Sequence, residues 1–420
     1  MPSLPLLLQE QARRRPDQPA LVEKGRTLTF AQLEQQAAQK ATLLREKGLK
    51  AGDGFLILLP PGIGAFVALL GAMRLGLRSL WPHGVVAPDT VRRVCQRHKP
   101  KGMVGPLSVL PLRWASPELR AVPVCLLQGF YLPFHPVWDD APADLPMAHP
   151  ADMRPDAPAL TMFATTTGHE VMTHTHDGLL QAQESMAEAL SPSPGVRHVQ
   201  QHVLTALAHL VVGGTVVFPA EAVPTAAGLL AQTMADLPAR LSLPAEVVSE
   251  VVTQAEAQRL SLFSLRQLVV EGSVHLSLLE RLQRLAPRAD VLSLTGPSSL
   301  VPLAVFHLGA TPPPGAVLSH MRPFGVPLAG VSARVMKDQR GTALPPLTLA
   351  GFDRLTLPPD HEGEVLFTGR LALEDDLTRP TVVDVEGVDW FRPGLKGLAD
   401  ARGTLWVAEK SPQQGLQIQL

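Results

Sequence analysis

The sequence predicts an α/β protein that combines two helix-covered, mostly parallel sheets with a small β-rich part. Short, continuous apolar runs, such as Phe-Leu-Ile-Leu-Leu at 55–59, are typical of strands that are buried on both faces. Segments with apolar residues at helical spacing follow these runs, and this alternation indicates parallel sheets covered by helices. From about residue 325, short strands separated by Gly and Pro turns replace the alternation.

The first half of the chain alternates most clearly. Thr29 and Gln32 have the spacing of a capping box, which predicts the start of a helix that ends at Gly48. Pro60-Pro-Gly62 then turns the strand at 55–59 into a helix over about 63–75. Further helices are expected near 88–98 and 176–190, and further strands near 122–127 and 160–164, with a loop between residues 164 and 176.

The second half continues the pattern. The apolar stretch 203–220 is interrupted by His209 and two glycines, so we expect a helix that turns into a strand rather than a membrane span. Strands are expected at 215–218, 267–270, 291–294, 331–336, 363–368 and 404–408, with helices near 244–258 and 275–286. We divide the chain into a first α/β subdomain (1–150), a second (151–324), a β-rich subdomain (325–410) and a tail (411–420).

Composition limits the function classes. The chain has 420 residues, 45% hydrophobic and 18% charged, which is enough for two or three packed subdomains. A net charge of -1 argues against a nucleic-acid partner. Cys95 and Cys125 form neither a disulfide framework nor a metal-ligand pattern. The N-terminus has no basic region before its short apolar run, so we expect a cytoplasmic protein with no signal peptide.

Two local patterns resemble functional motifs and are better explained by structure. Gly62-Ile-Gly64 follows a strand as a dinucleotide fingerprint would, but Val67 stands at the third glycine position, so we expect a simple turn. His174 and His176, with His169 nearby, lack further metal ligands. We expect a solvated or capping histidine pair at a helix start and no metal site.

Several motifs, in order and at specific spacing, resemble a known family. They include Arg15-Pro-Asp-Gln-Pro-Ala-Leu-Val22, Gly48-Leu-Lys-Ala-Gly-Asp53, Phe66-Val-Ala-Leu-Leu-Gly-Ala72 and Trp390-Phe-Arg-Pro-Gly394. Over residues 4 to about 410 the chain resembles the large N-terminal domain of the AMP-dependent synthetase/ligase family, the adenylate-forming acyl-CoA synthetases. The resemblance implies ATP or AMP and Mg²⁺ as cofactors, and a carboxylic acid as the group that is activated.

The family's phosphate loop is Thr/Ser/Gly-rich and ends in Pro-Lys-Gly. The matching segment here carries Thr165, Thr166, Thr167 and Gly168, followed by His169-Glu170 in place of the lysine. Hydroxyl groups and backbone amides suit phosphate oxygens, whereas an acidic Glu170 would repel them. The segment is also explained by a short polar turn that caps a helix.

A second motif departs from the family in the same way. Where the family has Tyr-Gly-x-Thr-Glu, this chain has Thr295, Gly296, Ser298 and Ser299. Ser298 can still donate a hydrogen bond to phosphate, but Ser299 lacks the carboxylate that holds Mg²⁺. Glu271-Gly272 stands for a Gly-Gly pair that borders the adenine and acyl pockets in the family.

The closing motif completes the set. The family's ribose-binding Asp corresponds to Leu395, while Arg392, Gly394 and Gly397 remain as turn and strand features. His198 or His202 matches a family residue at the acyl pocket. In the family, a further catalytic domain follows, where this sequence has only a short tail after Lys410.

These departures suggest a degenerate acyl-CoA synthetase-like pseudoenzyme. We expect little or no ligase activity from the chain alone, with binding of an acyl group or a nucleotide retained. Two alternatives stay open. One is an active adenylating or acyl-transfer enzyme that a partner chain completes with a C-terminal domain or a carrier protein. The other is a scaffold or docking subunit of a biosynthetic complex.

Overall fold

The computed structural model describes residues 3–84, 87–129, 138, 149–164, 170–221, 223–296, 302–309, 320–369 and 382–408. The chain forms two compact units. Unit one is Met1–Leu241, and unit two is Ser242–Arg370 together with Leu377–Leu420. The division falls inside strand β11 (Arg240–Pro244). The predicted α/β class with two sheets is confirmed, whereas the finer boundaries at 150 and 324 stay predictions.

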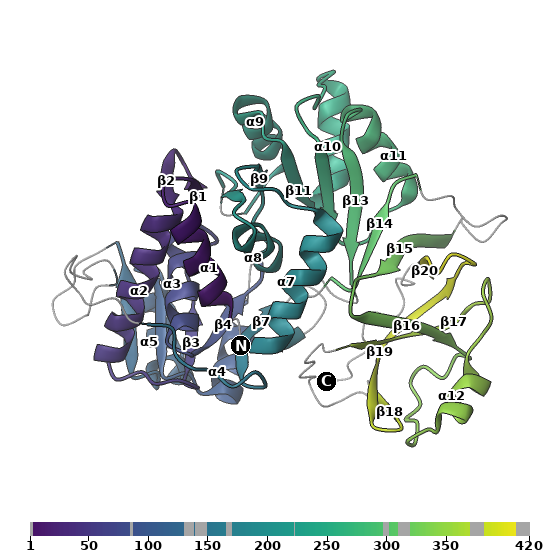
Figure 1. The fold of residues 1–420 in the computed structure, drawn as a ribbon, viewed down its shortest axis with the longest axis horizontal. Helices are drawn as coiled ribbons and strands as arrows, with labels where there is room; N and C mark the ends of the chain where they lie inside the picture. Colours follow the sequence, from purple (N-terminus) through teal and green to yellow (C-terminus); the bar gives the residue numbers. More distant parts are fainter. Residues whose placement is uncertain are drawn as a thin grey trace. The chain divides into compact units, whose positions relative to one another are not determined.

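Unit one contains a six-stranded sheet that is parallel except at one edge (Figure 1). The antiparallel pair is formed by its last two strands, which make a hairpin. In spatial order the strands are β6 (Val124–Gln128), β5 (Gly102–Pro106), β3 (Gly54–Ile57), β4 (Arg78–Pro82), β7 (Pro158–Ala164) and β8 (Glu170–Thr175).

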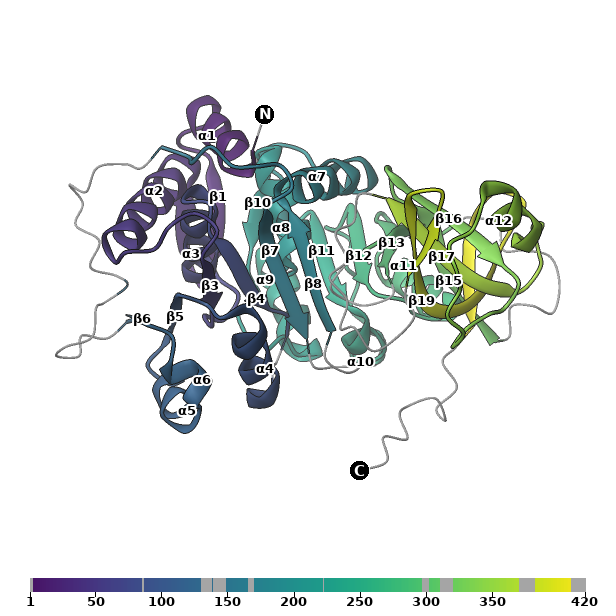
Figure 2. The same ribbon diagram turned by 90° about the horizontal axis from the view of Figure 1, so that it is seen from below.

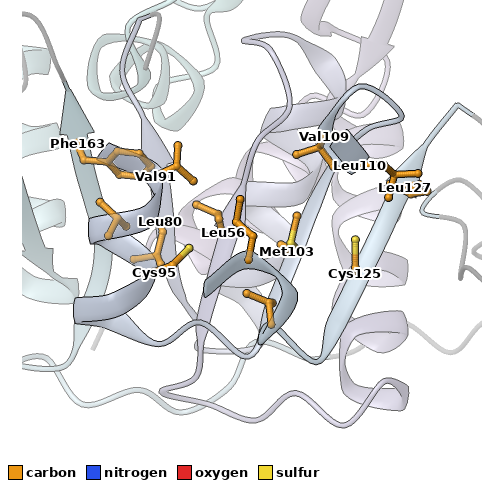
Figure 3. Packing of buried hydrophobic residues seen from close by; sticks show 13 residues of the cluster. Leu56, Leu80, Val91, Cys95, Met103, Val109, Leu110, Cys125, Leu127 and Phe163 are labelled. Carbon is orange, nitrogen blue, oxygen red and sulfur yellow. The ribbon is translucent and has the colours of Figure 1, made fainter. Parts of the chain in front are cut away.

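Helices cover both faces of this sheet (Figure 2). One face packs against α2 (Phe30–Glu46) and α3 (Ile63–Arg74), and the other against α4 (Pro88–His98), α5 (Val109–Ala115) and α6 (Pro117–Arg120). On the α4 side, Leu56 and Leu80 of the sheet contact apolar side chains of α4 and α5 in one buried cluster (Figure 3). Burial in this cluster raises the pKa of the Cys95 thiol to about 12.

The remaining strands of unit one lie beside one another in the order β2 (Arg26–Thr29), β1 (Pro19–Glu23), β10 (Thr215–Val217) and β9 (Arg197–Val199), and β9 pairs with the start of β11. Four helices accompany them: α1 (Leu4–Arg14), α7 (His176–Leu190), α8 (Val203–Val211) and α9 (Ala226–Asp236). Helix α7 packs along α8, and α8 has no exposed residue. The stretch 203–220 therefore forms a helix and a strand, as predicted.

Local signals placed most of these elements correctly. Thr29 and Gln32 form the capping box of α2, with both reciprocal hydrogen bonds present. Gly62 makes the predicted turn into α3, whose first N–H, on Ile63, donates to the Glu23 carboxylate at 2.9 Å. One prediction was wrong: the segment before α7 is not all loop, because residues 170–175 form β8 against β7.

Unit two begins with parallel strands and continues with antiparallel ones. Strand β12 (Gln267–Glu271) lies parallel to β13 (Asp290–Thr295), and helices α10 (Ala245–Ala257) and α11 (Leu276–Leu285) accompany them. The antiparallel strands follow in the order β14 (Ala304–His307), β15 (Met321–Pro327), β20 (Leu405–Ala408), β19 (Val388–Ala399), β17 (Gly363–Gly369) and β16 (Val331–Met336). Strand β18 (Val382–Val385) pairs with β19, and α12 (Leu349–Leu355) contributes Phe352 to the core beneath it.

The closing motif forms part of β19 and is held by a buried ion pair. The Arg392 guanidinium donates to both carboxylate oxygens of Glu364 on β17, at 3.0 and 2.9 Å. It also donates to the carbonyl oxygens of Thr342 and Gln339. Gly397 lies so close to β20 that a Cβ atom there would be 2.3 Å from the Trp406 carbonyl oxygen. The motif therefore has a structural role in joining three strands.

Within the described ranges, none of the helices has both the length and the apolar character that crossing a bilayer requires.

The buried ion pair yields a stability prediction. In the native pair, only 1% of the Arg392 side chain and 2% of the Glu364 side chain is exposed. Glu364→Gln leaves the buried Arg392 charge without its partner. Removing one partner of a buried pair typically costs about 3–5 kcal/mol. Urea unfolding should show a loss of that size. Asp353→Asn is the matched control, because Asp353 pairs with Arg334 at exposures of 61% and 41%. That variant should lose less than about 1 kcal/mol. Equal losses in the two variants would contradict the assigned role.

Candidate nucleotide and acyl site

The predicted site residues fall into three groups. Thr165, Thr166, Thr167, Gly168, Ser298 and Ser299 lie outside the described residues. His198 and His202 belong to unit one. Glu271, Gly272, Thr295, Gly296 and Leu395 belong to unit two.

Four of the unit-two residues lie together at one edge of the sheet. Glu271 ends β12 and Thr295 ends the neighbouring parallel strand β13. The N–H of Gly272 donates to the Leu294 carbonyl at 2.8 Å, and the Ser293 hydroxyl donates to the Gly272 carbonyl at 2.6 Å. The carboxyl ends of parallel strands are where open α/β sheets bind ligands. The pairs Glu271-Gly272 and Thr295-Gly296 are therefore adjacent, as a shared site requires.

Glu271 is a neutral acid in this position. Its Oε1 atom is buried and has no hydrogen-bonding partner among the described residues. Burial raises the pKa of Glu271 to about 8; a hydrogen bond from Ser242 opposes this shift and the nearby charge of Glu246 adds to it. At pH 7 the side chain is mostly protonated. It can donate a hydrogen bond, but it does not supply the charge that a metal ion needs.

Thr295 makes a hydrogen bond, and Leu395 a strand pairing, with other parts of the protein. The buried Thr295 hydroxyl donates to the carbonyl oxygen of Phe324 on β15. Leu395 is half-buried on β19, opposite Val365, with β14, β15 and β20 between β13 and β19 in the sheet order. No group of three or more His, Cys, Asp or Glu residues that could hold a metal ion occurs in the described parts of the chain.

In unit one, His198 is part of a buried histidine pair. The Nδ1 of His198 lies 2.9 Å from the Nε2 of His209, and the Nδ1 of His209 lies 3.0 Å from the Thr205 carbonyl. A carbonyl only accepts, so His209 carries its proton on Nδ1, and its Nε2 accepts from His198. Burial lowers the pKa of His209 to about 4, and it also lowers the pKa of His198 well below its usual value. Both rings are neutral at physiological pH.

Two further histidines lie near His202. The rings of His83 and His202 are 5.1 Å apart in an edge-on arrangement. Burial, and then the proximity of His202, lower the pKa of His83 to about 3 and that of His174 to about 4. A helix does start at His176, as expected, but neither histidine is solvated, and the residue that caps this helix is Thr175, whose hydroxyl accepts from the Gly178 N–H. Only 2% of His174, on β8, and 8% of His176, the first residue of α7, is exposed.

Helix α8 carries a polar face in addition to its apolar one. His202 stands at the N-cap position of α8 without a capping side-chain hydrogen bond, and Thr205 and His209 follow at spacings of three and seven, so the three share one side of the helix. All three are buried in an otherwise apolar helix. The helical spacing of these three polar residues is visible in the sequence and was the available signal. The sequence shows the spacing, but only the fold shows that His209 contacts His198 and that His202 contacts His83.

The neutral buried histidines predict acid sensitivity. Between pH about 6.5 and about 4, His174 is protonated in the unfolded chain and neutral in the folded one, so stability falls as the pH drops through that window. Each such group contributes a slope of about 1.4 kcal/mol per pH unit. Urea unfolding at several pH values should show His174→Leu flattening the wild-type slope by about this amount. The exposed control His361→Asn should leave the slope unchanged. Parallel slopes for wild type and His174→Leu would argue against a neutral buried ring.

Glu271 predicts the opposite trend. Its folded pKa, about 8, lies above the unfolded value, so stability falls as the pH rises from about 4.5 to about 8. Glu271→Gln keeps the shape and removes the titration. Relative to wild type, this variant should gain thermal stability progressively across that range, as measured by unfolding midpoints. Glu280→Gln, at an exposed position on α11, serves as the control. A Glu271→Gln variant that tracks wild type at every pH would show that the acid is charged and solvated.

The sequence is similar to curated proteins that are much longer. Phenyloxazoline synthase MbtB of Mycobacterium tuberculosis is 27% identical over 407 residues, which is 91% of this chain and 26% of that protein. Sulfoacetate–CoA ligase of Cupriavidus necator is 30% identical over 239 residues, covering 52% of this chain and 45% of the ligase. The chain thus spans about a quarter and under half of the lengths of these relatives.

Solved structures share the fold. A putative long-chain-fatty-acid CoA ligase from Rhodopseudomonas palustris superposes with a TM-score of 0.79 at 18% identity, covering 97% of this chain and 99% of that one. The anthranilate CoA ligase AuaEII, solved with anthranoyl-AMP, gives a TM-score of 0.78 at 16% identity, with coverages of 97% and 77%. The model of the AMP-binding enzyme family matches residues 8–373, and the chain therefore belongs to that family of adenylate-forming proteins.

Proposed function

We propose that this chain binds a carboxylic acid or a nucleotide on the adenylate-forming fold and has little or no ligase activity on its own. The observation that carries the proposal is the state of the described nucleotide positions in unit two. Glu271 is a neutral acid, the Thr295 hydroxyl bonds to backbone, and an apolar Leu395 stands on β19. The site that results has hydrogen-bonding capacity and lacks fixed negative charge.

This chemistry suits binding better than turnover. Activation of an acid by ATP develops charge on phosphate oxygens, and catalysis needs preorganised cations and donors around that charge. The resemblance places a lysine, a metal-binding Glu and a ribose-binding Asp at positions that here hold His169-Glu170, Ser299 and Leu395. If each loss costs about 2–3 kcal/mol of transition-state stabilisation independently, the rate falls by several powers of ten.

One observation favours a second candidate. The chain matches only a quarter of the length of phenyloxazoline synthase and under half of sulfoacetate–CoA ligase. An enzyme of this family could therefore be completed by additional protein, either a C-terminal domain or a carrier protein on a partner chain. In that case Glu271 and Leu395 would belong to an active enzyme with an altered nucleotide site.

Two assays on the isolated chain test the proposal. ATP–pyrophosphate exchange with a panel of carboxylic acids, including anthranilate, should stay at background. Thermal unfolding should shift upward with AMP or with at least one acid, because a ligand that binds the folded chain stabilises it. Leu395→Asp is the informative variant, since a carboxylate suits a ribose diol; it should enlarge the shift with AMP more than the shift with acids.

The outcomes separate the candidates. Robust exchange by the chain alone would refute the proposal. Exchange that appears only when a partner chain is added would establish the second candidate. A chain whose unfolding midpoint is unmoved by ATP, AMP or any acid, but which copurifies in a stable complex, would instead be a scaffold.

A further inference from the structure

The short helix α5 in unit one is apolar on both of its sides, although only one side is buried. Val109 and Leu110 belong to the buried cluster beneath the helix (Figure 3). On the other side, Leu107 and Trp114 are 37% and 66% exposed, and Pro111 between them is exposed as well. A helix that is apolar all round is normally buried on every side. Among the described residues, nothing covers the outer side of α5.

The three exposed side chains line up along the helix. Pro111 and Trp114 follow Leu107 at spacings of four and seven, which places all three on one side of a helix. Leu107 precedes α5, but its carbonyl accepts from the Leu110 N–H at 3.1 Å, so the turn begins there. We call Leu107, Pro111 and Trp114 the apolar stripe. Single exposed apolar side chains are common, whereas an aligned set of them indicates an interaction surface.

Positive charge surrounds the apolar stripe. Residues 88–120, which include α4, α5 and α6, contain seven Lys and Arg and two acidic residues, whereas the whole chain has a net charge of -1. Helix α4 buries its apolar side in the cluster, so its arginines lie on the outer side. Six of the seven basic side chains are exposed, and we call them the basic rim: Arg92, Arg93, Arg97, Lys99, Lys101 and Arg120.

Hydrogen bonds connect the basic rim with the apolar stripe. Gln96 on α4 donates to Glu118 on α6 at 2.7 Å. Arg113 on α5, next to Trp114, donates to the Arg120 carbonyl oxygen just after α6 at 3.4 Å. These contacts run from α4 through α6 to α5, and the three helices lie on the same side of the sheet (Figure 2). The rim and the stripe therefore form one continuous outer surface of unit one.

This surface extends to the amino ends of two parallel strands. Lys101 directly precedes β5, and Arg120 lies shortly before β6. Ligands of open α/β sheets bind at the carboxyl ends of the strands, which is the opposite edge. An interaction at the rim and the stripe thus goes beyond the proposed function and does not depend on it.

We propose that this surface docks unit one onto a membrane that contains anionic lipids. Charge complementarity carries the proposal, because each Lys or Arg near an anionic lipid surface strengthens binding about fivefold. Trp114 adds to it, since the indole ring suits the boundary between headgroups and acyl chains. An acidic protein would complement the charge equally. A fluid lipid boundary, however, also accepts an apolar stripe that projects outwards without a matching pocket.

Vesicle flotation with the full chain tests the proposal. One set of vesicles contains phosphatidylcholine and phosphatidylserine at about 3:1, and the other contains phosphatidylcholine alone. At low salt the chain should bind the anionic vesicles about tenfold more tightly than the neutral ones, or better. Raising the salt to about 0.5 M should release it, because ions screen the attraction.

Paired charge variants locate the contact. Arg93→Gln with Lys101→Gln removes two charges of the basic rim and should weaken binding about 25-fold. Arg13→Gln with Arg14→Gln is the matched control, because it removes two exposed charges from α1 in the same unit. The control should bind within about twofold of wild type, since those charges lie outside the docking surface. Equal unfolding midpoints would show that both double variants keep the fold.

Tryptophan fluorescence reports on the apolar stripe. Of the five tryptophans, the four besides Trp114 are at most 8% exposed. Anionic vesicles should therefore shift the emission of the wild type to shorter wavelength and protect it from acrylamide, and Trp114→Phe should lose both effects. Trp114→Ala should weaken vesicle binding about tenfold. Phe263→Ala removes a ring that is 52% exposed in unit two and should bind as wild type does.

Every outcome bears on the lipid assignment. No binding to anionic vesicles at low salt would overturn it, as would equal binding to neutral vesicles or an equal loss in the Arg13 and Arg14 control. Bound vesicles that leave the emission unchanged would show that α5 is not the contact. An acidic protein that copurifies, that high salt releases and that the Arg93 and Lys101 variant loses, with vesicles unbound, would make the surface a protein-docking site. Nucleotide and acid binding are tested separately by the thermal shifts with AMP and acids.

Discussion

Desolvation fixes the charge state of many groups in the chain's interior and thereby limits its chemistry. In unit one, four histidines around β9, α8 and β8 are held neutral by burial, and two of them share a hydrogen bond that requires one defined tautomer. In unit two, the same effect holds Glu271 protonated. Because both kinds of group lose their charge, these side chains can take part in hydrogen bonds but supply no charge. Arg392 and Glu364 keep their charges when buried because they neutralise each other.

Much of the fold could be predicted because its signals are local. The capping box at Thr29, the apolar run of β3 and the helix at residues 88–98 each depend on neighbours along the sequence, and each occurs where the pattern places it. Strand β8 was missed because its existence depends on pairing with β7. Its sequence, Glu-Val-Met-Thr-His-Thr, has no sustained apolar alternation to indicate a strand. His174 lies on this strand and is buried, so the wrong prediction of a loop also led to the wrong prediction that His174 is solvated.

The site was harder to predict than the fold, for a physical reason. Motif comparison shows which letter stands at a position, but not whether its side chain faces a ligand or the protein. Thr295 has a hydroxyl that suits phosphate, yet that hydroxyl is buried and bonds to Phe324 on the next-but-one strand. From the sequence alone, Glu271 is expected to carry a negative charge. Its buried environment keeps the side chain protonated, so that it can donate a hydrogen bond. Burial and long-range pairing decide both cases, and neither is visible in a local pattern.

The closing segment at 390–397 carries the most recognisable letters of the family, and its contacts explain them without reference to a reaction. Arg392 ties β19 to β17 and to two backbone carbonyls, and Gly397 lets β20 approach more closely than any other residue would allow. These residues are required by the geometry of the sheet. A search that ranks proteins by this motif would therefore retrieve chains that share the fold, whether or not they turn over a substrate. A match to the motif indicates a common fold and gives no information about catalysis.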